Sequence, residues 1–252
     1  MSLLPTSNTH YTYHSLDGNR YQRHSRSIPL CQRLFGCPQL NFEYAIWQMA
    51  YLLIAPSRVY RNIYYHKQTK NQWARDDPAF LILFAFLVCV SATAWGLSYS
   101  LGFIGILRTL LFMIFVDFLL VGILLATAYW FVSNRFLAQD AMVHATSQKV
   151  EWAYAFDVHC NSFFPVFLIL YVVQFFFMPL LQRSTWISLL VGNLMYFVSA
   201  LWYTYGTFLG YNALPFLVHT ELFLYPLGLS SVLFFVSLFG FNISQHVLSI
   251  YF

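Results

Sequence analysis

The chain has 252 residues, of which 59% are hydrophobic and only 9% are charged. A soluble globular domain carries about 25% charged residues, so 13 Lys and Arg with 9 Asp and Glu are too few to cover a water-soluble protein of this size. The apolar content is equally incompatible with disorder over most of the chain. The composition therefore excludes an ordinary soluble enzyme or a free nucleic-acid-binding domain, and it indicates an integral membrane protein.

The chain begins with a polar stretch, residues 1–40, that has no apolar period and no apolar core of a signal peptide. We expect this stretch to be a disordered cytosolic tail. Residues 42–55 are apolar, but they are shorter than the roughly 20 residues that a span needs, and Pro56 ends them. With Tyr44 and Trp47 among them, they predict a helix that lies in the membrane interface.

A segment rich in basic and aromatic residues follows, and together with the interfacial helix it makes up the predicted cytosolic region 41–78. Its candidate partner or membrane-surface contacts are Arg58, Arg61, Lys67, Lys70, Trp73 and Arg75. Basic side chains gain about 1 kcal/mol each near an anionic leaflet, and Trp and Tyr prefer the headgroup layer. The same residue types would also serve docking of a cytosolic protein, or RNA binding by phosphate contact and base stacking.

Five apolar runs follow, each long enough to span a membrane, so residues 79–252 are the predicted membrane domain. The runs are 79–99, 106–132, 162–181, 185–209 and 222–241. Asp77-Pro78 is typical of a helix start, because Asp is a good N-cap and proline is tolerated in the first turn. The predicted fold class is all-α: a multi-pass integral membrane protein with five transmembrane helices and an N-terminal cytosolic interfacial helix.

Lysine and arginine are unevenly divided between the two sides of this predicted bundle. The N-terminal region holds nine, and Arg135 and Lys149 in the connection between the second and third runs bring that side to eleven. The other side has only Arg108 and Arg183. By the positive-inside rule, we expect a cytosolic N-terminus and a C-terminus on the lumenal or exterior side.

Ionisable groups inside the apolar runs are candidates for function, because burying them in lipid is costly. Asp117 lies in the middle of the second run. We expect it to be protonated or hydrogen-bonded and to lock helix packing, through His159, Asn161 or Asn193. A path for protons, ions or lipid headgroups, or recognition of a partner within the membrane, are the alternatives.

A second group of polar residues, Glu151, Asp157 and His159, precedes the third run. A turn could bring them together for hydrogen bonding at the membrane edge, with a metal or proton site and catalysis as alternatives. The sequence has no HExxH, no GxSG of the rhomboid type and no second mid-span Asp beside Asp117. We therefore assign no catalytic, cofactor-binding or metal-binding residue, and we expect no enzyme. Together with Asp117, the candidate polar network is Glu151, Asp157, His159, Asn161 and Asn193.

Several stretches of the chain resemble one known family. They are FEYAIWQM at 42–49, PSRVYRN at 56–62, KQTKNQWARDDPAF at 67–80, EWAYAFDVH at 151–159, VGN at 191–193 and TFLGYNALPFL at 207–217. On these strings the chain is similar to the uncoordinated-type (Unc-fifty) Golgi membrane proteins of eukaryotes. The resemblance implies a multi-pass Golgi protein, without known enzymatic activity, that supports cell-surface delivery of receptors such as nicotinic acetylcholine receptors. It also implies a link to the exchange factors that activate Arf GTPases, and RNA binding at the nuclear membrane in one branch.

The sequence and the resemblance together predict a non-enzymatic trafficking or assembly factor of Golgi and early secretory membranes. Its expected partners are membrane lipids, Arf exchange factors and receptor cargo; RNA is a weaker alternative, and self-association is left open. The endoplasmic reticulum or the inner nuclear membrane is the alternative location. The rival function is a transporter, channel or lipid scramblase that uses Asp117 and the Asp157–His159 edge.

Overall fold

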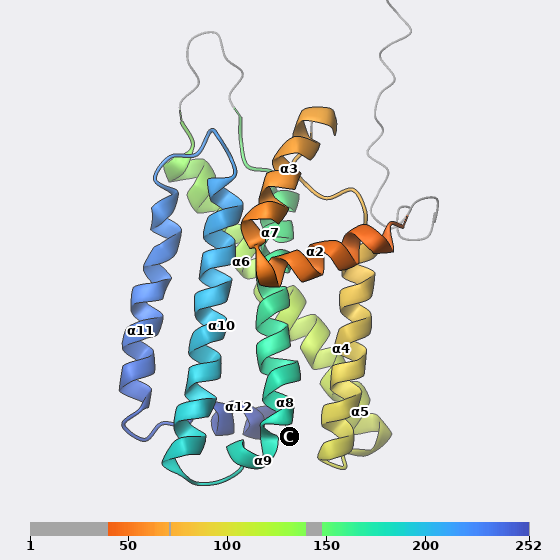
Figure 1. The fold of residues 1–252 in the computed structure, drawn as a ribbon, viewed down its shortest axis with the longest axis vertical. Helices are drawn as coiled ribbons and strands as arrows, with labels where there is room; N and C mark the ends of the chain where they lie inside the picture. The colour runs from red at the N-terminus through yellow and green to blue at the C-terminus, as the bar shows by residue number, and fades with distance from the viewer. Residues whose placement is uncertain (1–39, 71, 140–147, 252) are drawn as a thin grey trace, which may run out of the picture. The chain divides into compact units, whose positions relative to one another are not determined.

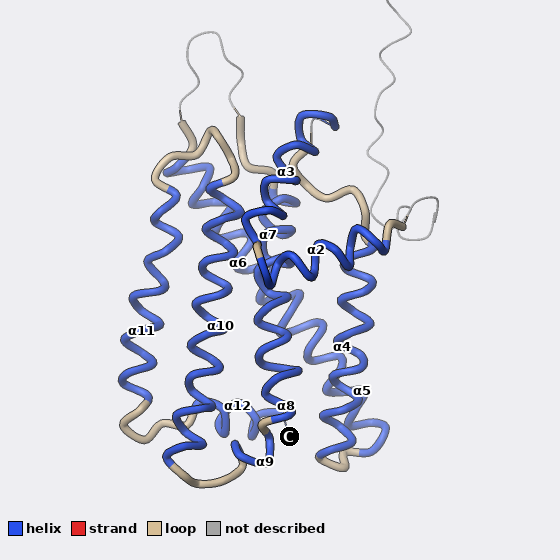
Figure 2. Tube along the Cα trace, in the orientation of Figure 1, coloured by secondary structure: helices blue, strands red, loops and turns tan. Residues whose placement is uncertain are grey.

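A computed structural model describes residues 40–70, 72–139 and 148–251 of the chain. The predicted disordered tail lies outside these ranges except for Leu40, so it stays a prediction. Figure 1 and Figure 2 show that the described part consists of helices joined by loops.

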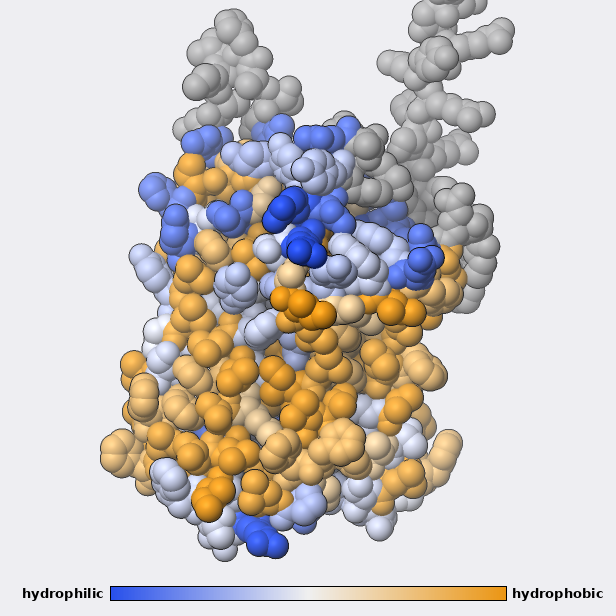
Figure 3. Space-filling model, viewed as in Figure 1, coloured by the Kyte–Doolittle hydropathy of each residue, from blue (hydrophilic) through white to orange (hydrophobic). Residues whose placement is uncertain are grey.

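Within the described residues, five helical segments are long and apolar enough to cross a membrane, which confirms the predicted all-α, five-span fold class. Figure 3 shows the apolar surface that they present, with hydrophilic residues gathered at the end that carries α3. The five spans are Ala79–Ser98, Gly102–Leu137, Trp152–Phe176, Trp186–Asn212 and Thr220–Ser237.

Three of the spans combine different helical types. The second joins α5 (Gly102–Phe112), the π-helical η1 (Met113–Leu120), α6 (Val121–Val132) and the π-helical η2 (Ser133–Leu137). The third joins α7 (Trp152–Phe167), the π-helical η3 (Leu168–Val173) and α8 (Gln174–Phe176). The fifth joins the 3-10 helix η4 (Thr220–Leu224) to α11 (Tyr225–Ser237), while α4 (Ala79–Ser98) and α10 (Trp186–Asn212) are the first and fourth spans.

The third span differs most from its prediction. It begins at Trp152, ten residues before the predicted start at 162, and it ends at Phe176. The polar residues Asp157, His159 and Asn161 hid this first part, because they lower the local hydropathy. They lie within α7, and each has hydrogen-bonding partners elsewhere in the fold.

The predicted interfacial helix is α2 (Phe42–Ile54), which Figure 1 shows lying crosswise to the spans. Asn41 caps it by accepting a hydrogen bond from the Tyr44 N–H at 2.9 Å. Its buried residues recur at helical spacing and pack on α4 and α7; they are Ala45, Gln48, Met49 and Leu52. The opposite face is also apolar, with Ile46 57% and Ile54 81% exposed, as expected of a helix that meets lipid.

Helix α3 (Pro56–Lys70) begins at Pro56 and packs on α10, where the buried Tyr60 lies beside Gly210; Val59 is also buried and belongs to the core that includes α2 and α4. Proline at the first position of a helix lacks only an N–H that would have had no intrahelical partner. We call the end of the bundle that carries α2 and α3 the α3 end, and the opposite end the α12 end.

Close packing of α7 and α10 forms the centre of the bundle. A Cβ atom on Gly206 would lie 2.9 Å from Ser162 Oγ, and one on Gly210 would lie 2.7 Å from Val158 Cγ1. The small-residue spacing of Gly206 and Gly210 therefore serves contact between two helices of the same chain.

A short helix that the sequence did not predict, α12 (Ile243–Tyr251), follows the fifth span. The chain turns at Gly240, whose φ of 127° is a conformation that side chains other than glycine rarely allow. The predicted fifth run, 222–241, had extended through this turn. Figure 1 shows α12 at the end of the bundle opposite to α3.

Two neighbouring leucines of α2 test how this helix is held. Leu52 is 2% exposed and Leu53 is 38% exposed. Replacing a buried Leu by Ala costs about 2–5 kcal/mol, so we expect Leu52→Ala to lower the thermal stability of the purified protein clearly. The matched Leu53→Ala should change it by about 0.5 kcal/mol or less. Equal effects of the two changes would show that α2 does not pack on the bundle as described.

Candidate functional site

The polar residues singled out from the sequence fall into separate places. Asp157 and Asn161 join Arg75 at the α3 end, and His159 lies deeper between α7, η1 and α10. Asp117 lies next to η3 and α12, and Asn193 holds the start of α12. The predicted candidate network is therefore not one cluster.

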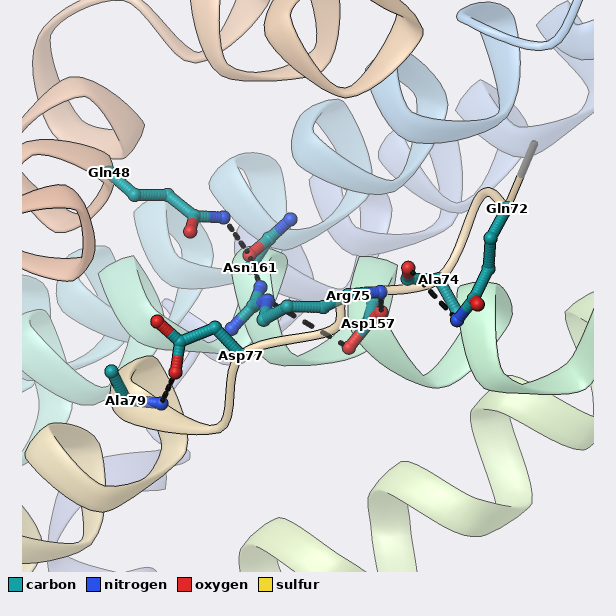
Figure 4. A network of polar contacts seen from close by, with 8 residues as sticks. All are labelled: Gln48, Gln72, Ala74, Arg75, Asp77, Ala79, Asp157 and Asn161. Atoms are coloured by element: carbon teal, nitrogen blue, oxygen red, sulfur yellow. Dashed lines mark hydrogen bonds and ion pairs between the residues drawn. The ribbon is translucent and has the colours of Figure 1, made fainter. Parts of the chain in front are cut away.

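Arg75 is the centre of the polar junction at the α3 end, shown in Figure 4. Its backbone N–H donates to Asp157 Oδ2 at 2.5 Å, and its Nη2 donates to Asn161 Oδ1 at 2.6 Å. Gln48 of α2 donates to the same Asn161 oxygen at 3.1 Å. The junction thus ties α2 and the segment after α3 to two successive turns of α7.

Charge and burial make this junction costly to disrupt. The Arg75 and Asp157 side chains are only 14% and 15% exposed, with Arg75 Nε 4.0 Å from Asp157 Oδ1. The guanidinium carbon of Arg75 also lies 4.2 Å from the centre of the Phe80 ring, a cation–π contact. Removing one member of such a buried pair leaves an uncompensated charge.

Three polar atoms at this junction keep unused hydrogen-bonding capacity. Tyr60 Oη, Arg75 Nη1 and Asn161 Nδ2 are buried without a hydrogen-bond partner among the described residues. Burial raises the pKa of the Tyr60 hydroxyl, so it remains a neutral donor at physiological pH.

Asp77 links the same region to the first span. Its Oδ1 accepts from the Ala79 N–H at 2.9 Å at the start of α4, and its Oδ2 accepts from the Asn41 N–H at 2.8 Å. Asp77 thus caps the start of α4 from one residue before the N-cap position, which Pro78 occupies, and the carboxylate also fixes the start of α2.

Two of the six predicted surface contacts point inward instead. Trp73 is 6% exposed and packs on Tyr154 and Phe216, and Arg75 is the buried centre of the junction. Arg58 and Arg61 are exposed on α3, and the Lys67 Nζ lies 5.4 Å from the centre of the Trp73 ring. The Lys70 side chain lies outside the described set. A basic–aromatic motif predicts the residue types of an interface, but it does not say which of them turn toward the core.

Asp117 lies in η1, and its partners differ from those expected. Its Oδ2 accepts hydrogen bonds from the Tyr171 hydroxyl at 2.7 Å and from the Tyr251 hydroxyl, rather than from His159, Asn161 or Asn193. Tyr171 belongs to η3 and Tyr251 to α12. The carboxylate therefore connects the second span, the third span and the unpredicted helix.

His159 is 2% exposed and lies among aromatic rings. Its Nδ1 is 2.9 Å from the Tyr203 hydroxyl and its Nε2 is 3.2 Å from the Phe118 carbonyl oxygen. A Cβ atom on Gly122 would lie 2.5 Å from His159 Nε2, so glycine makes room for the ring.

The remaining predicted network residues have local roles. Asn193 donates to Ser237 Oγ at 2.9 Å and to the Phe241 carbonyl at 2.8 Å, and it accepts from the Ile243 N–H at 2.9 Å. Glu151 stands at the N-cap of α7 without a capping hydrogen bond from its side chain. Among the residues that the structure describes, no three His, Cys, Asp or Glu side chains lie close enough together to hold a metal ion.

These features define a class: a polytopic all-α membrane protein with five spans, in which a crosswise helix is tied to the third span through a polar junction centred on a buried arginine. The model of the UNC-50 family matches residues 30–252. A Dictyostelium discoideum protein named "Protein unc-50 homolog" is 46% identical, over 91% of this chain and 89% of its own. The "Protein GMH1 homolog" of Schizosaccharomyces pombe is 44% identical over 90% and 98%, and the mouse "Protein unc-50 homolog" 42% over 99% and 98%. The chain belongs to the UNC-50 family. No solved structure gives a significant match.

A double-mutant cycle tests the junction. Arg75→Met leaves Asp157 buried without its cation, so we expect a loss of about 3–5 kcal/mol in the free energy of unfolding. Adding Asp157→Asn should recover part of that loss, because both charges are then gone. The exposed Arg61→Met is the matched control and should stay within about 0.5 kcal/mol of wild type. Strictly additive losses, measured by unfolding in detergent, would contradict the coupling.

Proposed function

We propose that this protein is a non-enzymatic trafficking factor of Golgi and early secretory membranes, which offers α3 to a cytosolic partner. The observation that carries the proposal is the construction of α3. Its inner side is fixed by the buried Val59 and Tyr60, while Arg58 and Arg61, one turn apart, are exposed. A charged helix face held rigidly on a membrane protein suits recruitment of a protein with an acidic surface.

The proposed partner is an Arf guanine-nucleotide exchange factor, and the proposed cargo is receptors such as nicotinic acetylcholine receptors. Membership of the UNC-50 family and the names of the relatives support a role in membrane trafficking or receptor assembly. RNA is a weaker candidate for the same surface, since Trp73, the strongest stacking residue of the motif, is buried.

The orientation that this function needs follows from charge. Arg58 and Arg61 lie at the α3 end, Arg135 lies in η2 at the end of the second span, and Lys149 lies in the connection that follows. By contrast, Arg108 lies in α5 and Arg183 lies between α9 (Met178–Leu181) and α10. We propose that the α3 end faces the cytosol and the α12 end the lumen.

Protease protection of sealed Golgi vesicles checks the orientation. Protease added outside should remove a tag placed before residue 1 and spare a tag placed after residue 252. The physical reason is the excess of Lys and Arg at the α3 end, which resists transfer across the membrane. The reverse pattern would put α3 in the lumen and exclude a cytosolic partner.

Charge reversal on α3 checks the recruitment itself. We expect Arg58→Glu with Arg61→Glu to leave the protein folded and located in the Golgi, because both side chains are exposed. Placing like charges against an acidic partner costs several kcal/mol, so exchange-factor recruitment should fall by about tenfold or more, and receptor delivery with it. Arg183→Glu, exposed at the other end, is the control and should have no effect. Normal recruitment by the double variant would contradict the proposal.

A further inference from the structure

A cavity of about 280 Å³ lies between the spans and beside α12. The residues that line it include Asp117, Trp95, Tyr171, Tyr196 and Tyr251. Its size is close to the lower end of the roughly 300–1,000 Å³ range of small-molecule sites. The orientation of the protein and the partner-binding face of α3 proposed above do not depend on this cavity.

Of the described residues that line the cavity, one is acidic, Asp117, and none is basic. Both hydroxyl partners of this carboxylate bind Oδ2, and Oδ1 accepts no hydrogen bond from the described residues. A carboxylate deep in a membrane without a cation beside it is costly. A bound cation would compensate that cost.

The walls of the cavity have the composition that recognises ammonium groups. Trp95, Phe163, Tyr171, Tyr196 and Tyr251 supply five aromatic side chains around one carboxylate. Aromatic rings attract ammonium cations through their quadrupole, more strongly where water is excluded. A protonated amine also offers several N–H donors, which matches the free oxygen of Asp117.

Two further properties restrict the rest of the ligand. Val121 lines the cavity and is 39% exposed on a span, so one wall reaches the surface that faces lipid. A ligand that enters there is itself apolar over most of its length. Because no Arg, Lys or His of the described part of the chain lines the cavity, it offers no cationic side chain to pair with a phosphate. A phospholipid headgroup therefore fits poorly.

Two polar side chains of the cavity stand on backbone that departs from the regular α-helix. Asp117 and Tyr171 stand on the two π-helical segments η1 and η3, and π-helical turns occur frequently at functional sites. The Tyr171 carbonyl accepts from Trp95 Nε1 at 2.9 Å, which fixes the indole beside the carboxylate.

From these observations we propose that the cavity binds a long-chain amine. The ligand class is a lipid-soluble molecule with one protonated amino group and no phosphate. Asp117 is its counter-charge, the aromatic side chains surround the ammonium group, and the alkyl chain leaves past Val121 into the bilayer.

Photolabelling of the purified full-length protein in detergent tests whether the cavity binds a long-chain amine. The probe is octadecylamine with a diazirine in its chain, and the competitors are octadecylamine, octadecanol and phosphatidylcholine. We expect saturable labelling of peptides that contain 113–121 or 243–251, displaced by octadecylamine at a concentration at least tenfold lower than by octadecanol. Absence of saturable labelling, or equal competition by the alcohol or the phospholipid, would overturn the proposal.

Asp117→Asn isolates the charge, because the amide oxygen still accepts hydrogen bonds from Tyr171 and Tyr251. It should weaken amine binding by about tenfold or more and leave octadecanol binding unchanged. An unchanged preference for the amine in this variant would also overturn the proposal.

A second pair of variants keeps the test decisive if Asp117→Asn does not fold. Val121→Trp fills the exposed wall of the cavity and should abolish labelling. Leu124→Trp is the matched control, since Leu124 lies one turn along α6, is 61% exposed and does not line the cavity. Equal labelling of the two tryptophan variants would contradict a site in this cavity.

Discussion

The rest of this structure depends on a constraint that lipid imposes: a polar group inside the bundle must find its partner within the protein. Arg75 shows the constraint most clearly. It precedes the first span, yet it binds α7 twice. Its backbone N–H binds Asp157, 82 residues further along the chain, and its side chain binds Asn161, 86 residues further along. With Gln48 bound to the same Asn161 oxygen, the N-terminal helices become part of the bundle. Without these partners, α7 would carry an unpaired acid and an unpaired amide.

The π-helical segments satisfy the same constraint by a different route. A π-helical turn changes the regular backbone ladder and leaves carbonyl groups open to other donors. Phe118 in η1 offers its carbonyl to His159, and Tyr171 in η3 offers its carbonyl to Ser91 and Trp95. Three side chains that would be costly in lipid thereby gain partners from the backbone of neighbouring spans.

The features that depend on a local pattern of residues could be predicted from the sequence. Runs of apolar residues predict the five spans, and the length of 42–55 with Pro56 after it predicts α2 as a helix too short to cross. The pairing of polar residues was not predictable in this way. Asp117 meets Tyr251 across 134 positions, and no periodicity in a single sequence relates two such residues. For the same reason the sequence alone assigns Arg75 and Trp73 to a surface. The start of α7 is missed because its polar residues lower the local hydropathy.

The exposed apolar side of helix α2 also indicates the depth at which this helix lies in the membrane. Its exposed apolar side, including Ile46 and Ile54, belongs at the boundary of the hydrocarbon layer. The second span has 36 residues, about 54 Å at 1.5 Å per residue, against a hydrocarbon thickness of about 30 Å. Tilt takes up part of this excess length. Figure 1 shows α3 continuing beyond the level of α2 beside the ends of α7 and α10. With α2 at the boundary of the hydrocarbon layer, α3 would extend away from that boundary, which is where the cytosolic partner proposed above would have to reach it.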